Sequence, residues 1–274
     1  MGSMTVALLG VGADSTNTTP TPPRYSDGAF EYIPIPESSE TIETRTYGNS
    51  PLRYGDGMMA DYLTEIRPHN KDGPSLTGAQ LRDWPLHHDP NFEALTYGET
   101  TSRGAYTKVL RGLDDGDIVA FYTGLQTKDT TYRHRYIIGY FTVKEIVDFQ
   151  NLDNGRESVR FGELPEIERH SLMKHHRENA HAKRFQATGS IARQNDGLVI
   201  VDGREPGERL ETAIRISEHL GGGHHYLTDQ LQAAFAPVPG GNPDRNAYLG
   251  GIKKAHILNI SPGNFRDVLD QIVV

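Results

Sequence analysis

The stretch "DGDIVAFYTGLQTKDTTYRHRYIIGYFTVKEIVDF", residues 115–149, decides the fold class. A turn at Asp115 and Gly116 leads into residues 118–122, an apolar and aromatic run that predicts a strand. After a polar connection, residues 136–147 predict a second, longer strand, and Gly139 inside it is typical of a bend or bulge. Two such strands joined by a loop predict an antiparallel pair.

The segments on either side predict a mixture of helices and strands. The predicted helices are a short one at residues 105–110, one near residues 58–66, a charged one over residues 164–185, "RLETAIRIS" at residues 209–217, a short one near residues 227–235 and a closing one from Asn264. The predicted strands are "TVALLGVGA" at residues 5–13, the extended "AFEYIPIPES" at residues 29–38, "DGLVIVDG" at residues 196–203 and "AHILNI" at residues 255–260. Because strands and helices do not alternate regularly, we expect an α+β fold. We expect one compact domain over residues 1–274, with a possible subdivision near residues 150–160, and residues 1–4 as an expression scar and start.

The composition excludes several classes of function. The chain has no cysteine, which rules out disulfides, thiolate nucleophiles and cysteine-ligated metals. Its formal net charge of −8 argues against a protein that coats nucleic acid, so any nucleic-acid contact should be local. No apolar run approaches the roughly 20 residues needed to cross a bilayer, and no signal-peptide pattern opens the chain, so we expect a cytoplasmic protein without a membrane partner.

The stretch "HHRENAHAKR", residues 175–184, concentrates histidines and cations. On one helix His176 and His181 lie five residues apart and do not converge, so the spacing predicts no metal. His170, Lys174, Arg177, His181 and Arg184 step by four, three, four and three, which predicts a cationic stripe on one helix face. The stripe is either a solvated face paired with nearby glutamates or an edge that holds phosphate, with a histidine available for proton transfer.

Two further stretches are rich in groups that could bind a ligand. "LHHDPNFEALTYGE", residues 86–99, offers histidines, a carboxylate and an aromatic, although Asp89 before Pro90 is also typical of a turn cap. "ADSTN", residues 13–17, follows the first strand, where either ligand contacts or loop capping are common. A dinucleotide fingerprint, a phosphate-binding loop, a nucleophile elbow and the HExxH motif are all missing from the sequence.

Two sets of motifs resemble known families. "GDIVAFYTG" followed by "YIIGYFTVKEIVDF" resembles the barrel strands of PUA-like domains of the EVE and ASCH type. The wider order of "VGADSTN", "FEYIPIPES", "HHDPNFEALTYGE", "GDIVAFYTGL", "NAHAKRF" and "ERLETAIRIS" resembles the nucleotide modification associated domain, type three, over nearly the whole chain. The resemblance implies a PUA-like curled mixed sheet or barrel with flanking helices, and a link to modified nucleic acid.

The resemblance also implies a site in which a flipped base enters a pocket. Tyr97 and Tyr122 become candidates for the pocket wall, Asp14, Asn17 and Asp89 for reading the base edge, and His181, Lys183 and Arg184 for the phosphate; His88, Arg177 and Asn179 complete the nucleotide-binding candidates. Lys183 lies off the cationic stripe if the helix is regular.

Two hypotheses of function follow, and the sequence favours the first. The first is a module that binds a modified base or nucleotide, in DNA rather than RNA. The second is an enzyme of a DNA hypermodification pathway, with Asp14, Asp89 and His181 performing acid–base work. Neither requires a cofactor, and both allow partner proteins of a modification system; a purely structural partner in such a system is the third alternative.

Overall fold

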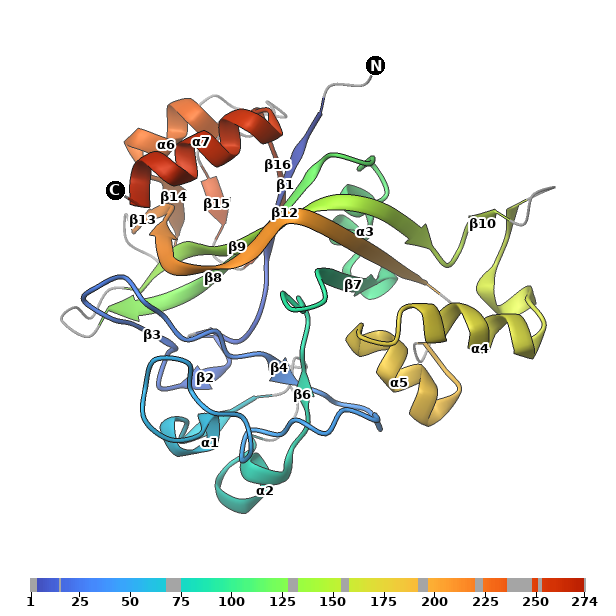
Figure 1. Ribbon diagram of the computed structural model, residues 1–274. Coiled ribbons are helices and arrows are strands. Elements are labelled where there is room, and N and C mark those ends of the chain that lie inside the picture. Colours follow the sequence, from blue (N-terminus) through green and yellow to red (C-terminus); the bar gives the residue numbers. More distant parts are fainter. Residues whose placement is uncertain are drawn as a thin grey trace.

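The centre of the protein is a seven-stranded mixed sheet, in the order β16, β1, β8, β9, β12 and β7, with β3 pairing beside β8 (Figure 1). The computed structural model describes residues 4–14, 16–67, 75–127, 133–153, 158–191, 197–219, 224–235, 248–250 and 253–273. The strands are β1 Val6–Gly10, β3 Pro23–Arg24, β7 Thr96–Thr100, β8 Ile118–Thr127, β9 Arg133–Asp148, β12 Leu198–Arg215 and β16 Ala255–Leu258. β1 and β3 run parallel to β8, whereas the other neighbours are antiparallel, so the predicted α+β class is confirmed.

The predicted antiparallel pair is confirmed as β8 and β9. Their register shifts between Phe121, opposite Gly139, and Tyr122, opposite Ile137. Ile138 is therefore the extra residue of a β-bulge beside Gly139, as the glycine predicted. A Cβ atom at Gly139 would lie 2.4 Å from the Phe92 ring and 2.6 Å from a backbone oxygen, so this crowded position requires glycine. The described strands form an open path and no closed barrel, so the PUA-like form of the sheet stays a prediction.

The predicted helix at residues 209–217 is wrong, because these residues continue strand β12 and its link to β13 (Ser217–His219). Leu210, Ala213 and Ile214 have helical spacing, and this spacing produced the error. In the structure the register of β12 against β9 shifts between Arg209 and Ile214. This irregularity lets the adjacent side chains of Ala213 and Ile214 both become buried within a strand.

The predicted charged helix over residues 164–185 is two helices, α4 (Glu166–His175) and α5 (Ala180–Thr188). The break occurs because Asn179 caps α5, its Oδ1 accepting a hydrogen bond from the His181 N–H at 3.0 Å. The single-face stripe is therefore wrong. Its first three members, His170, Lys174 and Arg177, are exposed, whereas His181 is buried.

Helices and a lobe of short elements cover the two sides of the sheet (Figure 1). Helices α6 (Asp229–Phe235) and α7 (Pro262–Val273) lie on one side, and their Phe235 and Phe265 join the main core. The N-terminal lobe lies on the other side and has a core of its own around Ile33, Tyr47 and Leu81. It contains β2 Thr18–Thr19, β4 Ile35–Pro36, α1 Met59–Tyr62, β5 Glu65–Ile66, α2 Gly78–Asp83 and β6 Leu86–His87.

Most of the other predicted elements are present. α3 (Gly104–Leu110), α6, α7, β1 and β16 match their predicted positions, while residues 58–66 contain only the single turn α1 before β5. The remaining short elements are the 3₁₀ turns Thr101–Arg103 and Phe161–Glu163, and strands β10 Leu152–Asp153, β11 Ser158–Val159, β14 His225–Leu227 and β15 Tyr248–Gly250. Among the described residues, no helix is both long enough and apolar enough to span a bilayer.

Candidate functional site

A cavity of about 210 Å³ lies where the N-terminal lobe, the sheet and α5 meet. Its polar side chains come from segments far apart in the sequence. The acidic, basic and histidine side chains are His87 and Asp89 at the end of β6, Glu99 on β7, Arg103 before α3, His181 and Arg184 on α5, and Lys253 before β16, and the hydroxyl side chains are Ser38, Tyr97, Thr100 and Ser102. Such convergence of distant polar groups on one cavity is typical of a ligand site.

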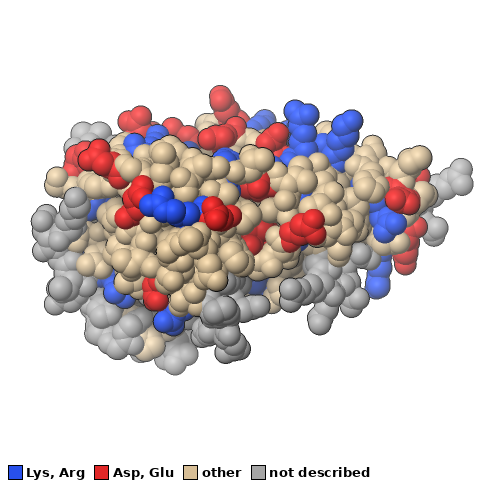
Figure 2. All heavy atoms as spheres, turned by 90° about the horizontal axis from the view of Figure 1, so that it is seen from below, with Lys and Arg blue, Asp and Glu red and all other residues tan. Residues whose placement is uncertain are grey.

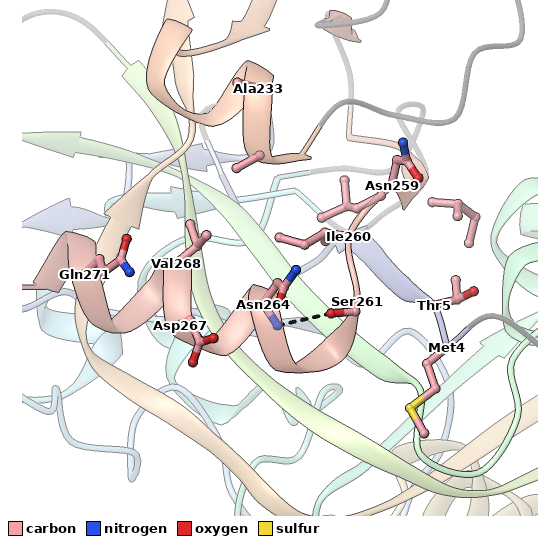
Figure 3. Close-up of a pocket in the computed structure, with 13 residues that line it drawn as sticks. Met4, Thr5, Ala233, Asn259, Ile260, Ser261, Asn264, Asp267, Val268 and Gln271 are labelled. Atoms are coloured by element: carbon pink, nitrogen blue, oxygen red, sulfur yellow. Dashed lines mark hydrogen bonds between the residues drawn. The ribbon is translucent and has the colours of Figure 1, made fainter.

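A larger hollow of about 660 Å³ lies between α7, β16 and the start of the chain (Figure 3). Apolar, amide and hydroxyl side chains line it, and Asp267 is the one ionisable side chain among the residues described there. The smaller cavity therefore holds the chemically capable groups, and we take it as the candidate site.

Strand alternation places His87 and Asp89 on the same side of the chain. β6 pairs with β4 of the lobe, and successive side chains of an extended segment point in opposite directions. His87 and Asp89 consequently face the cavity, whereas His88 does not line it. Burial, together with the charge of Arg45, lowers the pKa of His88 to about 3, which keeps this ring neutral. His88 was predicted to bind the nucleotide, and the structure instead brings its neighbour His87 to the cavity.

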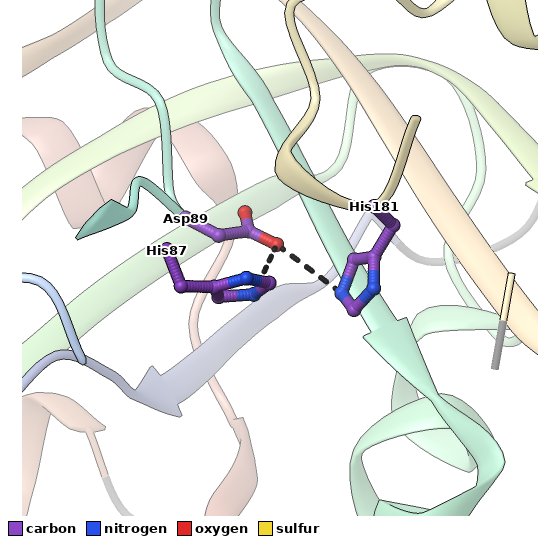
Figure 4. Close-up of side chains that lie close together, drawn as sticks. All are labelled: His87, Asp89 and His181. Carbon is purple, nitrogen blue, oxygen red and sulfur yellow. Dashed lines mark ion pairs between the residues drawn. The ribbon is translucent and has the colours of Figure 1, made fainter. Parts of the chain in front are cut away.

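His87, Asp89 and His181 form a compact group at the cavity (Figure 4). Asp89 Oδ2 lies 3.6 Å from His181 Nε2 and 3.9 Å from His87 Nε2, and the centres of the two rings are 4.9 Å apart. The side chains of His87, Asp89 and His181 are only 9%, 3% and 6% exposed. The segment that contains His87 and Asp89 therefore contacts α5, although Asp89 and His181 are 92 positions apart in the sequence.

Gly98 on β7 holds this group in place. Its N–H donates to both oxygens of the Asp89 carboxylate, at 3.1 and 2.9 Å. A Cβ atom at Gly98 would lie 2.6 Å from Cδ2 of His181, so the ring packs directly against the backbone. The absence of a side chain at Gly98 therefore allows Asp89 and His181 to approach each other.

Burial shifts the pKa values of the acid and the base in opposite directions. It raises the pKa of Asp89 well above the ordinary value, against the hydrogen bonds from Gly98. It lowers the pKa of His181 well below the ordinary value, aided by His87 and Arg184. A neutral imidazole beside a readily protonated carboxyl group is an arrangement typical of functional sites.

A buried carboxylate behind His87 orients its ring. Glu37, next to β4, places Oε2 2.8 Å from His87 Nδ1, and its two oxygens accept hydrogen bonds from Arg184 at 2.7 and 3.0 Å. Burial raises the pKa of Glu37, but His87 and Arg184 outweigh that effect and the pKa is lowered. With Nδ1 engaged by Glu37, the Nε2 atom of His87 is the one that faces Asp89.

Of the other predicted residues, Tyr97 lines the cavity, and its hydroxyl donates to Glu99 at 2.9 Å. Arg184 also lines the cavity, although it pairs with Glu37. Asp14 lies beyond Lys253, whose Nζ is 3.5 Å from its Oδ2. Asp89, Tyr97, His181 and Arg184 are thus brought together, with Asp14 next to them.

The remaining predicted residues do not line the cavity. Asn17 accepts a hydrogen bond from the Asp14 N–H at 2.7 Å and so caps its own loop, whose Ser15 is outside the described residues. Tyr122 is buried in the core, with its hydroxyl donating to the Lys254 carbonyl. Lys183 pairs with Glu43 at 2.8 Å, Asn179 caps α5, and Arg177 is exposed beside Glu178. Each of these side chains has a hydrogen-bond or ion-pair partner within the protein.

Among the acidic, basic and histidine residues of the site, sequence reasoning missed five, namely Glu37, His87, Glu99, Arg103 and Lys253. The alternation of β6 was the available signal for His87, because it excludes His88 from the side on which Asp89 lies. Glu99 lies in the stretch at residues 86–99 that was already singled out, whereas Glu37, Arg103 and Lys253 come from segments that sequence reasoning did not connect to the site.

Charge at the site is balanced. Arg103 pairs with Glu99 at 2.8 Å and lies over the Tyr106 ring, Arg184 pairs with Glu37, and Lys253 approaches Asp14. Figure 2 shows the face on the side of the lobe, where Lys and Arg are interspersed with Asp and Glu and the described part has no continuous basic patch. This agrees with a local contact to a small ligand and argues against a broad nucleic-acid track on that face.

One family matches this chain. Residues 5–237 match the model of nucleotide modification associated domain 3. No curated protein and no solved structure matches the chain. Since the matched part is most of the sequence, the resemblance seen in its motifs is confirmed, and the chain belongs to the nucleotide modification associated domain 3 family.

Proposed function

We propose that the chain is an enzyme that binds one nucleotide of modified nucleic acid in the cavity and performs acid–base chemistry on it. The observation that carries the proposal is the buried group of His87, Asp89 and His181 on the cavity wall. The family to which the chain belongs is associated with nucleotide modification, and the cavity is where we propose that the nucleotide binds.

The pKa directions favour an enzyme over a pure binding module. Asp89, whose pKa is raised, is suited to donate a proton, and His181, whose pKa is lowered, is suited to accept one. Burying ionisable groups costs stability, so their presence on the cavity wall favours a chemical role over simple recognition. A module that only reads a base needs hydrogen-bonding groups, which hydroxyls and amides supply without that cost.

The cavity volume defines the size of the ligand. About 210 Å³ is below the roughly 300–1,000 Å³ of pockets that enclose drug-sized molecules, so a single ring fits inside while the rest of a nucleotide stays outside. Tyr97, Ile35 and Pro36 supply apolar wall. Arg103, with its side chain 25% exposed, is the more accessible of the two arginines that line the cavity and is assigned the phosphate.

The test begins with binding. Thermal-shift and calorimetric screening against canonical and modified nucleosides, nucleoside monophosphates and short oligonucleotides should identify a ligand of the wild-type protein. Stabilisation by no member of the panel would overturn the proposal.

The second stage compares turnover with binding. Mass spectrometry of the bound ligand after incubation should show a product with the wild type and with His175→Asn, a control on the exposed surface of α4. His181→Asn should keep binding and lose the product. A proportionate loss of binding in His181→Asn, with no product from the wild type, would instead establish the binding module as the function. Asp89→Asn should also lose the product. Circular dichroism of each variant shows whether the loss of product comes from lost chemistry or from unfolding.

A further inference from the structure

We infer that His87, Asp89 and His181 form a binding site for a divalent transition-metal ion, with Zn²⁺ as the best fit. The inference deepens the proposed function and rests on it for the role of the ion, but the site itself is argued from its geometry. The three ligand atoms lie within 4.8 Å of one another, and all three residues are buried.

The separations of the ligand atoms are close to those that zinc requires. Bonds of about 2.0–2.1 Å at tetrahedral angles place two ligand atoms roughly 3.4 Å apart. The Asp89 oxygen is 3.6 Å from the His181 nitrogen and 3.9 Å from the His87 nitrogen. The ligand atoms of His87 and His181 lie within 4.8 Å of each other, so the site has to contract before all three residues contact one ion.

The surroundings of His87 resemble the outer shell of a metal centre. Histidine ligands of metals usually give their other ring N–H to a carboxylate, which fixes the ring and makes the ligand more basic. Glu37 is placed to do this, 2.8 Å from Nδ1, and it is itself held by Arg184. With Nδ1 bound to Glu37 in this way, the lone pair of His87 Nε2 is directed at the position that the ion would occupy.

The donor set selects the class of ion. Two imidazoles and one carboxylate suit Zn²⁺ and Fe²⁺, whereas Mg²⁺ and Ca²⁺ prefer sites made of oxygen. Three protein ligands beside a cavity are typical of catalytic rather than structural zinc, since one position is left for a substrate or water. With an ion bound, Asp89 and His181 would serve as its ligands, and the ion would act as a Lewis acid on an oxygen of the bound nucleotide in place of direct proton transfer by these two side chains.

A second group with the same spacing offers a control. Glu145, His175 and Asp202 also lie within 4.8 Å of one another, but Glu145 and His175 are exposed. Asp202 is already engaged by His176 at 3.0 Å and by the Thr96 hydroxyl at 3.3 Å. We therefore expect weak binding at most, and His175→Asn should leave the tight site unchanged.

The test measures metal without reference to activity. Protein stripped with EDTA and dialysed is titrated with Zn²⁺, Fe²⁺ under anaerobic conditions and Mg²⁺, with calorimetry, thermal shift and elemental analysis as readouts. We expect one tight Zn²⁺ per chain and no response to Mg²⁺. His87→Asn, Asp89→Asn and His181→Asn should each weaken Zn²⁺ binding by at least 100-fold, and Glu37→Gln by about 10- to 100-fold.

The outcomes are separable. Wild-type protein that takes up Zn²⁺ no more tightly than folded His87→Asn and His181→Asn overturns the inference, and so does tight binding abolished by His175→Asn. A preference for Fe²⁺ with the same pattern of variants supports the site and overturns the assignment to zinc. Nucleotide binding without metal binding overturns this inference alone, whereas metal binding without nucleotide binding overturns the proposed function alone.

Discussion

Replacing Gly98 by alanine adds one methyl group at the point where β7 meets His181. The added Cβ would lie 2.6 Å from Cδ2 of His181 and 3.0 Å from Oδ1 of Asn179. Gly98 does not have the positive φ that would make alanine unfavourable for the backbone, so the effect is purely one of space.

The size of the effect follows from these distances. Carbon atoms in contact are ordinarily about 3.5–4.0 Å apart, so the ring has to move by about 1 Å. It cannot move outward cheaply, because His181 is 5% exposed and Asn179 is 1% exposed. Overpacking of this kind costs about 1–3 kcal/mol. A ligand atom displaced by about 1 Å also lies far outside the ±0.2 Å tolerance of a metal bond.

Urea denaturation and Zn²⁺ calorimetry measure the two consequences. Gly98→Ala should lower the free energy of unfolding by about 1–3 kcal/mol and weaken Zn²⁺ binding by at least tenfold. Gly104→Ala is the matched control, because nothing lies within 4 Å of its Cβ position at the start of α3, and it should be neutral or slightly stabilising. Wild-type stability and wild-type affinity in Gly98→Ala would refute the packing argument.

Three further predictions concern stability, each measured by denaturation. Burial raises the pKa of Glu43, but Arg45 and Lys183 outweigh this effect and lower the pKa from 4.5 to about 2. The carboxylate therefore stabilises the fold above pH 4.5, and Glu43→Gln should lower the free energy of unfolding by up to about 3 kcal/mol at pH 7. This difference in stability between wild type and variant should disappear near pH 2. Asn179→Ala removes the cap of α5 and should cost about 1–2 kcal/mol, whereas Asn179→Ser should retain most of it; equal losses would contradict a capping role. Phe265→Ala empties a fully buried position between Tyr140 and Phe235 and should cost about 3–5 kcal/mol without weakening Zn²⁺ binding.

Local patterns predicted the parts of the fold that depend on neighbouring residues. β8, β9 and the bulge at Gly139 follow from short-range features of one segment. The error in β12 arose because a register shift against β9 produces a burial pattern that imitates a helix, and that shift depends on a partner strand. Asparagine favours helix caps, but the regular spacing of charges through Asn179 predicted a single helix, and the cap was missed.

The site was predictable only in pieces. Asp89, Tyr97 and His181 were recognisable as reactive or aromatic residues in polar stretches, but nothing local indicates that β6 and α5 meet. The expectation of no metal considered histidines of one helix, whereas the group in the structure combines His181 with His87 and Asp89 from another segment. Arg184 was predicted to bind phosphate because its actual partner, the buried Glu37, lies 147 residues earlier in the sequence and local patterns do not reveal the ion pair.

The distance in sequence between the parts of this cluster affects how the protein is made. During synthesis on the ribosome, Glu37, His87 and Asp89 emerge long before His181 and Arg184. A nascent chain therefore lacks the second imidazole until α5 has left the exit tunnel and docked. Truncated translation products and proteolytic fragments that end before α5 should consequently bind neither a metal ion nor a ligand at this cluster. The ability to bind should arise in one late step of folding.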